Sequence, residues 1–306
     1  MSIFPTRILF ASDASEDSEL AATTAVGLAK ITGSELHVLH VAPAFPDHFE
    51  PSDPELGPTE REGRRLLNEQ VNKIENVGGA VAQSHFRMGG AAEEVIDLAE
   101  ELGVGLIVLG SRGRGRIRRA LMGSVSDSVV RHAHCPIMVV RWRPLVFPAK
   151  ILLATDGSEE ADLAAQSAAD LSARTGSELH VTHVGKVLSH GGAGVKASYV
   201  GVEVDPLPAG PQEALDKEAK EVLEAQLARM GEDGVSVTEA HLMSGRADEE
   251  IIVRAEQVGA DLVVVGSRGL GGVRRALMGS VSDSVVRHAH CPVLVVRREG
   301  GRQEPV

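Results

Sequence analysis

The sequence predicts an α/β fold that is written twice in one chain, and a long internal repeat is the first observation behind this prediction. The 19-residue run Arg118–Pro136 recurs without a change at Arg274–Pro292, shifted by 156 positions. Near the start of each half the shift is smaller, because Ile8–Asp13 recurs as Ile151–Asp156, 143 positions later. Each copy of about 150 residues is close to the commonest domain size and is long enough to bury its own core.

The second observation is that short apolar runs alternate with helical patterns along each copy. A short apolar run between polar residues is typical of a strand that is buried on both faces. In the first copy such strands are expected at Arg7–Ser12, Ser34–Val41, Val81–Phe86, Leu106–Leu109 and Ile137–Val140. Strands that alternate with helices in this way predict an open parallel sheet with helices on both faces.

Helices are expected between these strands. The first should begin after Ser15, because serine is a favoured N-cap, and should end at Gly33, because glycine is the favoured residue after a helix. The other helices are expected at Thr59–Val77, Ala91–Leu102 and Ser124–His132.

The second copy repeats this order from Ala149, so the predicted domains are residues 1–143 and 149–298. The linker Arg141–Pro148 contains two prolines. The 13 additional positions of the second copy fall within Gly185–Pro211, which is rich in glycine and proline. This stretch is expected to be a surface loop, where an insertion disturbs the core little. The tail Glu299–Val306 is expected to be disordered.

The composition is that of a globular protein, with 43% hydrophobic and 24% charged residues. A net charge of −12 argues against nucleic-acid binding. No apolar run approaches the ~20 residues that span a bilayer, and no signal-peptide pattern opens the chain. Cys135 and Cys291 fit a reducing compartment better than a secreted scaffold, although a disulfide between them stays an alternative. A cytoplasmic protein without a nucleic-acid or membrane partner is therefore expected.

A glycine loop follows the fourth predicted strand of each copy. It reads Gly-x2-Gly-x9-Gly-Ser from Gly110 to Ser124 and again from Gly266 to Ser280. Ligands of open parallel sheets bind outside the carboxyl ends of the strands, where the strand order reverses. The first strand of each copy ends at the same place with an aspartate, Asp13 or Asp156.

These residue types suit a phosphorylated ligand. Gly110 and Gly113 are expected to let the backbone turn sharply and approach a ligand closely. Gly123 and Ser124 stand at a predicted helix N-terminus, where unpaired N–H groups and the helix dipole favour anions. The hydroxyls of Ser124 and Ser126 can donate to phosphate oxygens, and an aspartate can accept from a ribose. The alternative is that each loop is only a tight turn, and one duplication explains why it is present twice.

The loop pattern, the strand-end aspartate and the segment His134–Pro136 before the last strand together resemble the ATP-binding branch of the universal stress protein family. The resemblance covers essentially the whole chain as a tandem pair. It implies a Rossmann-like fold similar to the adenine nucleotide alpha hydrolases, with the strand order 3-2-1-4-5 in each half. It also implies that the fifth strands adjoin in an intrachain pseudo-dimer; whether two such chains pair again as a homodimer is left open.

The resemblance further implies ATP, ADP or AMP as the ligand of each half, with Mg²⁺ carried on the phosphates. Adenine is expected near Val41 or Val184 and ribose near Asp13 or Asp156. In the first half the implied binding residues are Ala11, Asp13, Val41, Gly110, Arg112, Gly113, Gly123, Ser124, Val125 and Ser126. In the second half they are Ala154, Asp156, Val184, Gly266, Arg268, Gly269, Gly279, Ser280, Val281 and Ser282.

The arginines of the two loops differ. The first loop contains Arg112, Arg114, Arg116, Arg118 and Arg119, whereas the second contains Arg268, Arg274 and Arg275. Tighter or more salt-sensitive phosphate binding is therefore expected at the first site. The alternative is that these arginines form a solvated surface.

Neither loop contains the lysine of a P-loop, which is a common source of transition-state stabilisation. The resemblance implies a nucleotide-dependent stress-response module that an unknown protein partner reads, and the missing lysine adds the expectation of little or slow hydrolysis and no catalytic residue. The alternatives are a slow Mg²⁺-dependent ATPase or other nucleotide-processing enzyme, and a structural or chaperone-like protein with vestigial pockets.

No metal site is expected. His37 and His40 are three residues apart on one strand, as are His180 and His183, so the members of each pair point to opposite faces. Cys135 and Cys291 have no neighbouring base in the sequence and are expected to be packing residues rather than nucleophiles.

Overall fold

The computed structural model describes residues 4, 6–44, 56–113, 122–141, 147–187, 210–270 and 278–298. In the first half the elements are β1 (Arg7–Ser12), α1 (Glu16–Thr32), β2 (Glu35–Ala42), α2 (Leu56–Asn76), β3 (Gln83–Met88), α3 (Ala91–Leu102), β4 (Leu106–Gly110), α4 (Ser124–His132) and β5 (Ile137–Val140). In the second half they are β6 (Lys150–Ala154), α5 (Glu159–Thr175), β7 (Glu178–Gly185), α6 (Gly210–Glu232), β8 (Glu239–Ser244), α7 (Ala247–Val258), β9 (Leu262–Gly266), α8 (Ser280–His288) and β10 (Val293–Val296).

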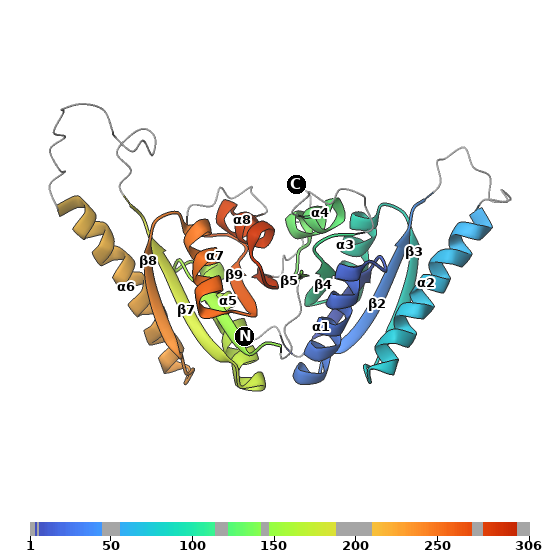
Figure 1. The fold of residues 1–306 in the computed structure, drawn as a ribbon, viewed down its shortest axis with the longest axis horizontal. Coiled ribbons are helices and arrows are strands. Elements are labelled where there is room, and N and C mark those ends of the chain that lie inside the picture. Colours follow the sequence, from blue (N-terminus) through green and yellow to red (C-terminus); the bar gives the residue numbers. More distant parts are fainter. Residues whose placement is uncertain are drawn as a thin grey trace, which may run out of the picture.

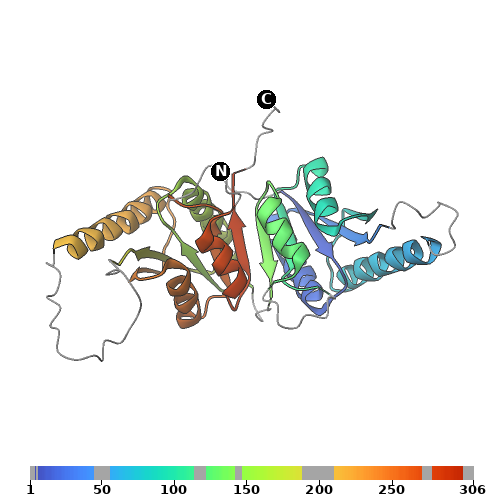
Figure 2. The same ribbon diagram turned by 90° about the horizontal axis from the view of Figure 1, so that it is seen from above.

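The strands form one ten-stranded sheet in the order β3-β2-β1-β4-β5-β10-β9-β6-β7-β8. Each half has the implied order 3-2-1-4-5, and its neighbouring strands are parallel. The halves meet where β5 and β10 pair antiparallel, with Met138 opposite Leu294. Figures 1 and 2 show this junction in the middle of the molecule, with α4 and α8 beside it. The predicted α/β fold and the adjoining fifth strands are confirmed.

Two apolar layers sandwich the sheet. Helices α1, α2, α5 and α6 pack on one face over a cluster that contains Phe10, Val108 and Leu153. Helices α3, α4, α7 and α8 cover the other face over a cluster that contains Leu9 and Ile107. Successive residues of β1 and β4 thus enter opposite layers, as the two-residue period of a strand requires.

The helix ends explain why the first predicted helix is found where the sequence placed it. The Ser15 hydroxyl accepts a hydrogen bond from Ser18 N at 3.2 Å, and Gly33 ends the helix with a φ of 68°. The same cap occurs in the second half, where the Ser158 hydroxyl accepts from Ala161 N at 3.2 Å.

Several predicted boundaries were wrong by one to three residues, and the third strand is the clearest case. It was expected at Val81–Phe86 but lies at Gln83–Met88, because β2 sets its register and pairs His37 with Gln83. The second strand starts at Glu35, and α2 begins at Leu56 rather than Thr59.

Part of the predicted loop structure lies outside the described residues. This holds for most of the linker, for most of the Gly185–Pro211 insertion and for the tail Glu299–Val306. No helix in the described part of the chain has the length and apolarity needed to cross a membrane.

Candidate functional site

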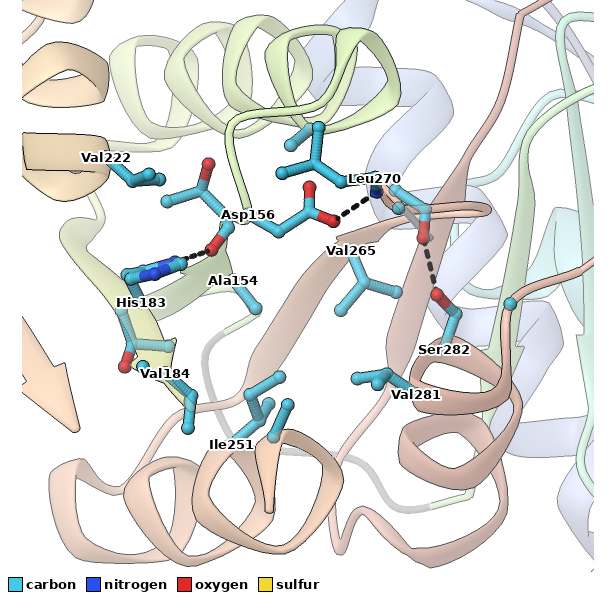
Figure 3. A pocket seen from close by; sticks show the side chains of 18 of the residues that line it. Ala154, Asp156, His183, Val184, Val222, Ile251, Val265, Leu270, Val281 and Ser282 are labelled. Carbon is cyan, nitrogen blue, oxygen red and sulfur yellow. Dashed lines mark hydrogen bonds between the residues drawn. The ribbon is translucent and has the colours of Figure 1, made fainter. Parts of the chain in front are cut away.

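A cavity of about 570 Å³ opens at the carboxyl ends of the strands in the second half. Its walls come from the ends of β6, β7 and β9, from α6 and α7, and from the N-terminus of α8. Figure 3 shows an apolar wall of Val184, Ile251, Val265 and Val281, with Asp156 on the opposite side. The cavity therefore has an apolar part and a polar part.

All ten residues that the sequence singled out in the second half line this cavity. They come from four separate segments of the chain: Ala154, Asp156, Val184, Gly266, Arg268, Gly269, Gly279, Ser280, Val281 and Ser282. In the first half the corresponding residues lie at the matching strand ends, at Ala11, Asp13, Val41 and Gly110, in the loop at Arg112 and Gly113, and at the start of α4, from Gly123 to Ser126.

The N-terminus of α8 presents backbone donors to the cavity. The first backbone bond of the helix runs from Asp283 N to Gly279 O at 2.9 Å, so the N–H groups of the three residues from Ser280 to Ser282 precede the helical ladder. The N-cap Gly279 has no side chain that could accept from them. The α4 N-terminus is built alike on Gly123. Both differ from α1 and α5, whose serine caps occupy such donors.

The three glycines of each loop motif differ in what a side chain at their position would meet. A Cβ at Gly266 would meet the backbone carbonyl carbon of Glu160 at 2.9 Å, and a Cβ at Gly269 would collide with Asp156 Oδ2. In contrast, a Cβ at Gly279 meets no atom closer than 3.5 Å, and its φ of −76° suits any residue. The first half repeats this pattern at Gly110, Gly113 and Gly123.

Gly110 and Gly113 were expected to let the backbone turn sharply, and the structure gives a different reason for these glycines. Neither has a positive φ, and the same holds for Gly266 and Gly269. They are glycines because the strand end packs on a helix backbone and because an aspartate lies against the loop. Among the loop glycines that the structure describes, only Gly123 and Gly279 leave space that no protein atom requires.

Asp156 ties the loop to the strand end. Its Oδ1 accepts from Ser158 N at 3.0 Å. Its Oδ2 accepts from Leu270 N at 3.0 Å (Figure 3). A carboxylate has about four acceptor positions, so these two bonds leave capacity for a hydroxyl of a ligand.

The Ser126 and Ser282 hydroxyls do not have the role that was expected for Ser126. Each donates to the carbonyl at the end of its neighbouring strand, Gly110 or Gly266, at 2.7 Å. These bonds fix the last helix of each half to the sheet. Only the backbone N–H of these two serines is then left for an anion, whereas Ser124 lies at the exposed start of its helix.

The family model described as "Universal stress protein family" matches residues 5–141 and again 149–297. The chain belongs to the universal stress protein family. A universal stress protein of Mycobacterium tuberculosis is 32% identical over 94% of this chain and 95% of its own length. One from Mycolicibacterium smegmatis is 29% identical over 95% of this chain and 96% of its own.

A solved structure has the same tandem architecture. The universal stress protein of Archaeoglobus fulgidus aligns with a TM-score of 0.70 at 26% identity, covering 97% of this chain and 98% of its own. The alignment spans both halves, so the arrangement of two copies in one chain is shared.

In this universal stress protein the loop arginines that are described contact acidic residues. Arg112 Nε lies 3.3 Å from Asp17 Oδ2, and Arg268 Nε lies 3.5 Å from Glu160 Oε1. Each acidic partner sits in the first turn of the helix after the first strand. The remaining predicted arginines, from Arg114 to Arg119 and at Arg274 and Arg275, lie outside the described residues.

Several cavity residues of the universal stress protein were missed by sequence reasoning. His183 lines the cavity and bonds through Nδ1 to the Thr155 carbonyl at 2.7 Å, and Val222 of α6 lines it from the far side (Figure 3). Lys186 and Glu218 add opposite charges to the lining. Lys186 directly follows β7, and this position could have indicated it as a cavity residue. The α6 residues could not be found in this way, because they reach the cavity only through the packing of that helix.

The histidines have contacts between strands that the pattern of a single strand does not reveal. His37 and His40 do have partners on opposite faces, His85 and the Ser12 carbonyl. However, His180 lies beside Glu239 and His241 of the neighbouring strand, so reasoning within one strand missed a cluster.

Cys135 and Cys291 are buried free thiols, and burial raises the pKa of Cys291 to about 12.

Proposed function

We propose that each half of the chain binds an adenine nucleotide, with ATP as the expected ligand, and that occupancy is read by a protein partner in a stress response. The observation that carries this proposal is the junction at Gly279. There the N-terminus of α8, which has no side-chain cap, faces the cavity. The space beside Gly279 is not filled by any protein atom that the structure describes. Helix N-termini of this kind favour phosphate groups.

The rest of the cavity supports a nucleotide rather than a free phosphate. A volume of about 570 Å³ lies in the range of small-molecule sites. The apolar wall of Val184, Ile251 and Val265 suits a base, and Asp156 at the end of β6 suits the hydroxyls of a ribose. Mg²⁺ would be carried on the phosphates.

Binding with little hydrolysis is the proposed mode of action. The cavity lining contains Lys186 and Arg268, but neither stands in a P-loop pattern. The described residues therefore offer phosphate positioning by backbone N–H groups. A slow Mg²⁺-dependent ATPase is the alternative that the same experiments separate.

The deciding experiment is a titration of the full-length protein with ATP, after nucleotide retained from purification has been released and identified. A Cβ at Gly279 or Gly123 meets no atom closer than 3.5 Å, so Gly279→Val and Gly123→Val each place a side chain in one proposed phosphate space. Each is expected to remove one of two equivalents of ATP, and the double variant should remove both. Gly231→Val on α6, where a Cβ meets no atom within 4 Å, is the matched control and should bind as the unmodified protein does.

Unchanged ATP binding in the double variant would overturn the proposal. Incubation with Mg²⁺ and ATP tests the alternative, because the proposal expects ATP to be recovered intact. The single variants also test the difference between the two loops: binding that remains in Gly279→Val should be tighter or weaken more steeply with salt than binding that remains in Gly123→Val.

A further inference from the structure

Three metal-binding side chains meet near the beginning of β7 and β8. The parallel register places His180 opposite Glu239 and Thr182 opposite His241, so His180, Glu239 and His241 lie on the same face of the sheet. Their ligand atoms all lie within 4.8 Å of one another. His180 Nδ1 is 3.2 Å from His241 Nε2 and 3.9 Å from Glu239 Oε2.

The setting of the cluster is suited to a cation. Both imidazoles are buried, whereas the Glu239 side chain is 63% exposed and opens the cluster to solvent. His180 Nε2 lies 3.5 Å from Glu178 Oε2, and Lys150 Nζ holds that carboxylate at 3.2 Å. A carboxylate behind a histidine in this manner orients the ring and increases its basicity toward a metal.

The described groups around the cluster carry charges of both signs. Arg254 of α7 is the positive group that acts on His241, and its Nη2 also contacts Met243 Sδ at 2.9 Å. Two carboxylates, Glu178 and Glu239, lie beside the histidines. Lys150 pairs with Glu178, so two carboxylates stand against two positive groups and the described charges around the cluster roughly cancel.

The first half contains a natural comparison. His37 and His85 repeat the imidazole pair, with Nδ1 and Nε2 at 3.2 Å, but Gln83 stands where the second half has Glu239. The histidine is also the one residue that β3 and β8 share at matching positions. The pair alone can be satisfied by its N–H···N hydrogen bond, so the carboxylate is what distinguishes the second half.

We propose that His180, His241 and Glu239 bind one divalent transition-metal ion of the zinc class in the second half. Two neutral imidazoles and a carboxylate are a common ligand set for Zn²⁺, with a fourth position left to water. The site is separate from the nucleotide cavity, whose lining takes the end of β7 from Thr182 onward. The first half lacks the third ligand and does not form the site.

The test is a metal titration of the full-length protein, stripped with a chelator and free of nucleotide. Co²⁺ serves as the spectroscopic probe, and Zn²⁺ is then used to displace it. One equivalent of Co²⁺ is expected to give the visible bands of a four- or five-coordinate site. Glu239→Gln, which copies the first half at an exposed position, should weaken binding at least about tenfold.

Two further variants make the result decisive. His241→Gln should abolish the Co²⁺ bands, with circular dichroism as the check on folding. Gln83→Glu should add a second equivalent by completing the ligand set of the first half. Binding that is unchanged in Glu239→Gln, or that stays at one equivalent in Gln83→Glu, would overturn the proposal.

Discussion

Arg141 and Arg297 each cap a helix of the other half across the junction between β5 and β10. Arg141, after β5, donates to the carbonyls of Val286 at 2.6 Å and of Arg287 at the end of α8. Arg297, after β10, donates to the Val130 carbonyl at 2.7 Å and to the Ala133 carbonyl at the end of α4. Each half therefore caps the C-terminus of a helix of the other half, α8 or α4. The N-terminus of that same helix lies at the candidate phosphate site.

This exchange lies beside an ionic cluster on the same helices. Arg131 contacts Asp283 across the junction at 3.1 Å, and Arg287 contacts Asp127 in the reciprocal direction. Burial lowers the pKa of both Arg141 and Arg297 to about 10, so both remain charged at pH 7. A cation at a helix C-terminus is stabilising.

The exchanged caps predict that the junction depends on both arginines. Arg297→Met should lower the free energy of unfolding by roughly 2 kcal/mol, because it leaves buried helix carbonyls without a donor. Arg141→Met should act likewise. Urea unfolding of the full-length protein measures this. Arg298→Met is the control, since Arg298 is 65% exposed and its pairing with Glu159 should contribute little. Equal effects of Arg297→Met and Arg298→Met would contradict the prediction.

Ala14 is strained and its counterpart is not. Ala14 has a φ of 58°, whereas Gly157 at the matching position of the second half has a φ of 78°. A left-handed conformation costs an alanine about 1 kcal/mol, and glycine avoids this cost. Ala14→Gly is therefore expected to raise the midpoint of thermal unfolding, and Gly157→Ala to lower it. A lower midpoint of thermal unfolding in Ala14→Gly would show that Ala14 is not strained.

One hydrogen bond is present in the first half and missing from the second. Ser111 Oγ donates to Asp17 Oδ2 at 2.8 Å, but Ser267 Oγ is buried without a partner among the described residues, where Glu160 replaces the aspartate. Glu160→Asp should supply this acceptor and stabilise the protein by about 1 kcal/mol. Asp17→Glu should destabilise by a similar amount. Urea unfolding of both variants measures these two changes. A Glu160→Asp variant with an unchanged free energy of unfolding would contradict the prediction.

Stability is expected to fall as the pH decreases below 6.5. Burial lowers the pKa of His37, His85 and His241 below the ordinary value of 6.5. The unfolded chain then binds protons that the folded chain does not, so this stabilisation is complete above pH 6.5 and is lost toward the lowered pKa. The slope is at most about 1.4 kcal/mol per pH unit for each histidine.

His85→Gln checks this dependence in the half without the proposed metal site. Urea unfolding at pH 7.5 and pH 5.5, with a chelator present, should show a smaller loss for the variant than for the unmodified protein. The same loss in both would mean that His85 does not contribute.

The sequence alone was sufficient for the fold class, because the repeat, the alternation of strands and helices, and the caps at Ser15 and Gly33 are local signals. Part of the cavity lining in the second half was also predictable. Residues such as Asp156 and Gly279 lie at strand ends and helix starts, and a parallel sheet necessarily brings those points together.

Only the tertiary structure decided what depends on neighbours that are distant in the chain. It showed that Gly269 is a glycine because Asp156 lies against it, and that His180 meets His241 and Glu239 on the next strand. It also showed that Arg297 caps a helix of the other half. Periodicity determines which face a side chain takes, but contacts between strands and helices arise from register and packing, which no single segment specifies.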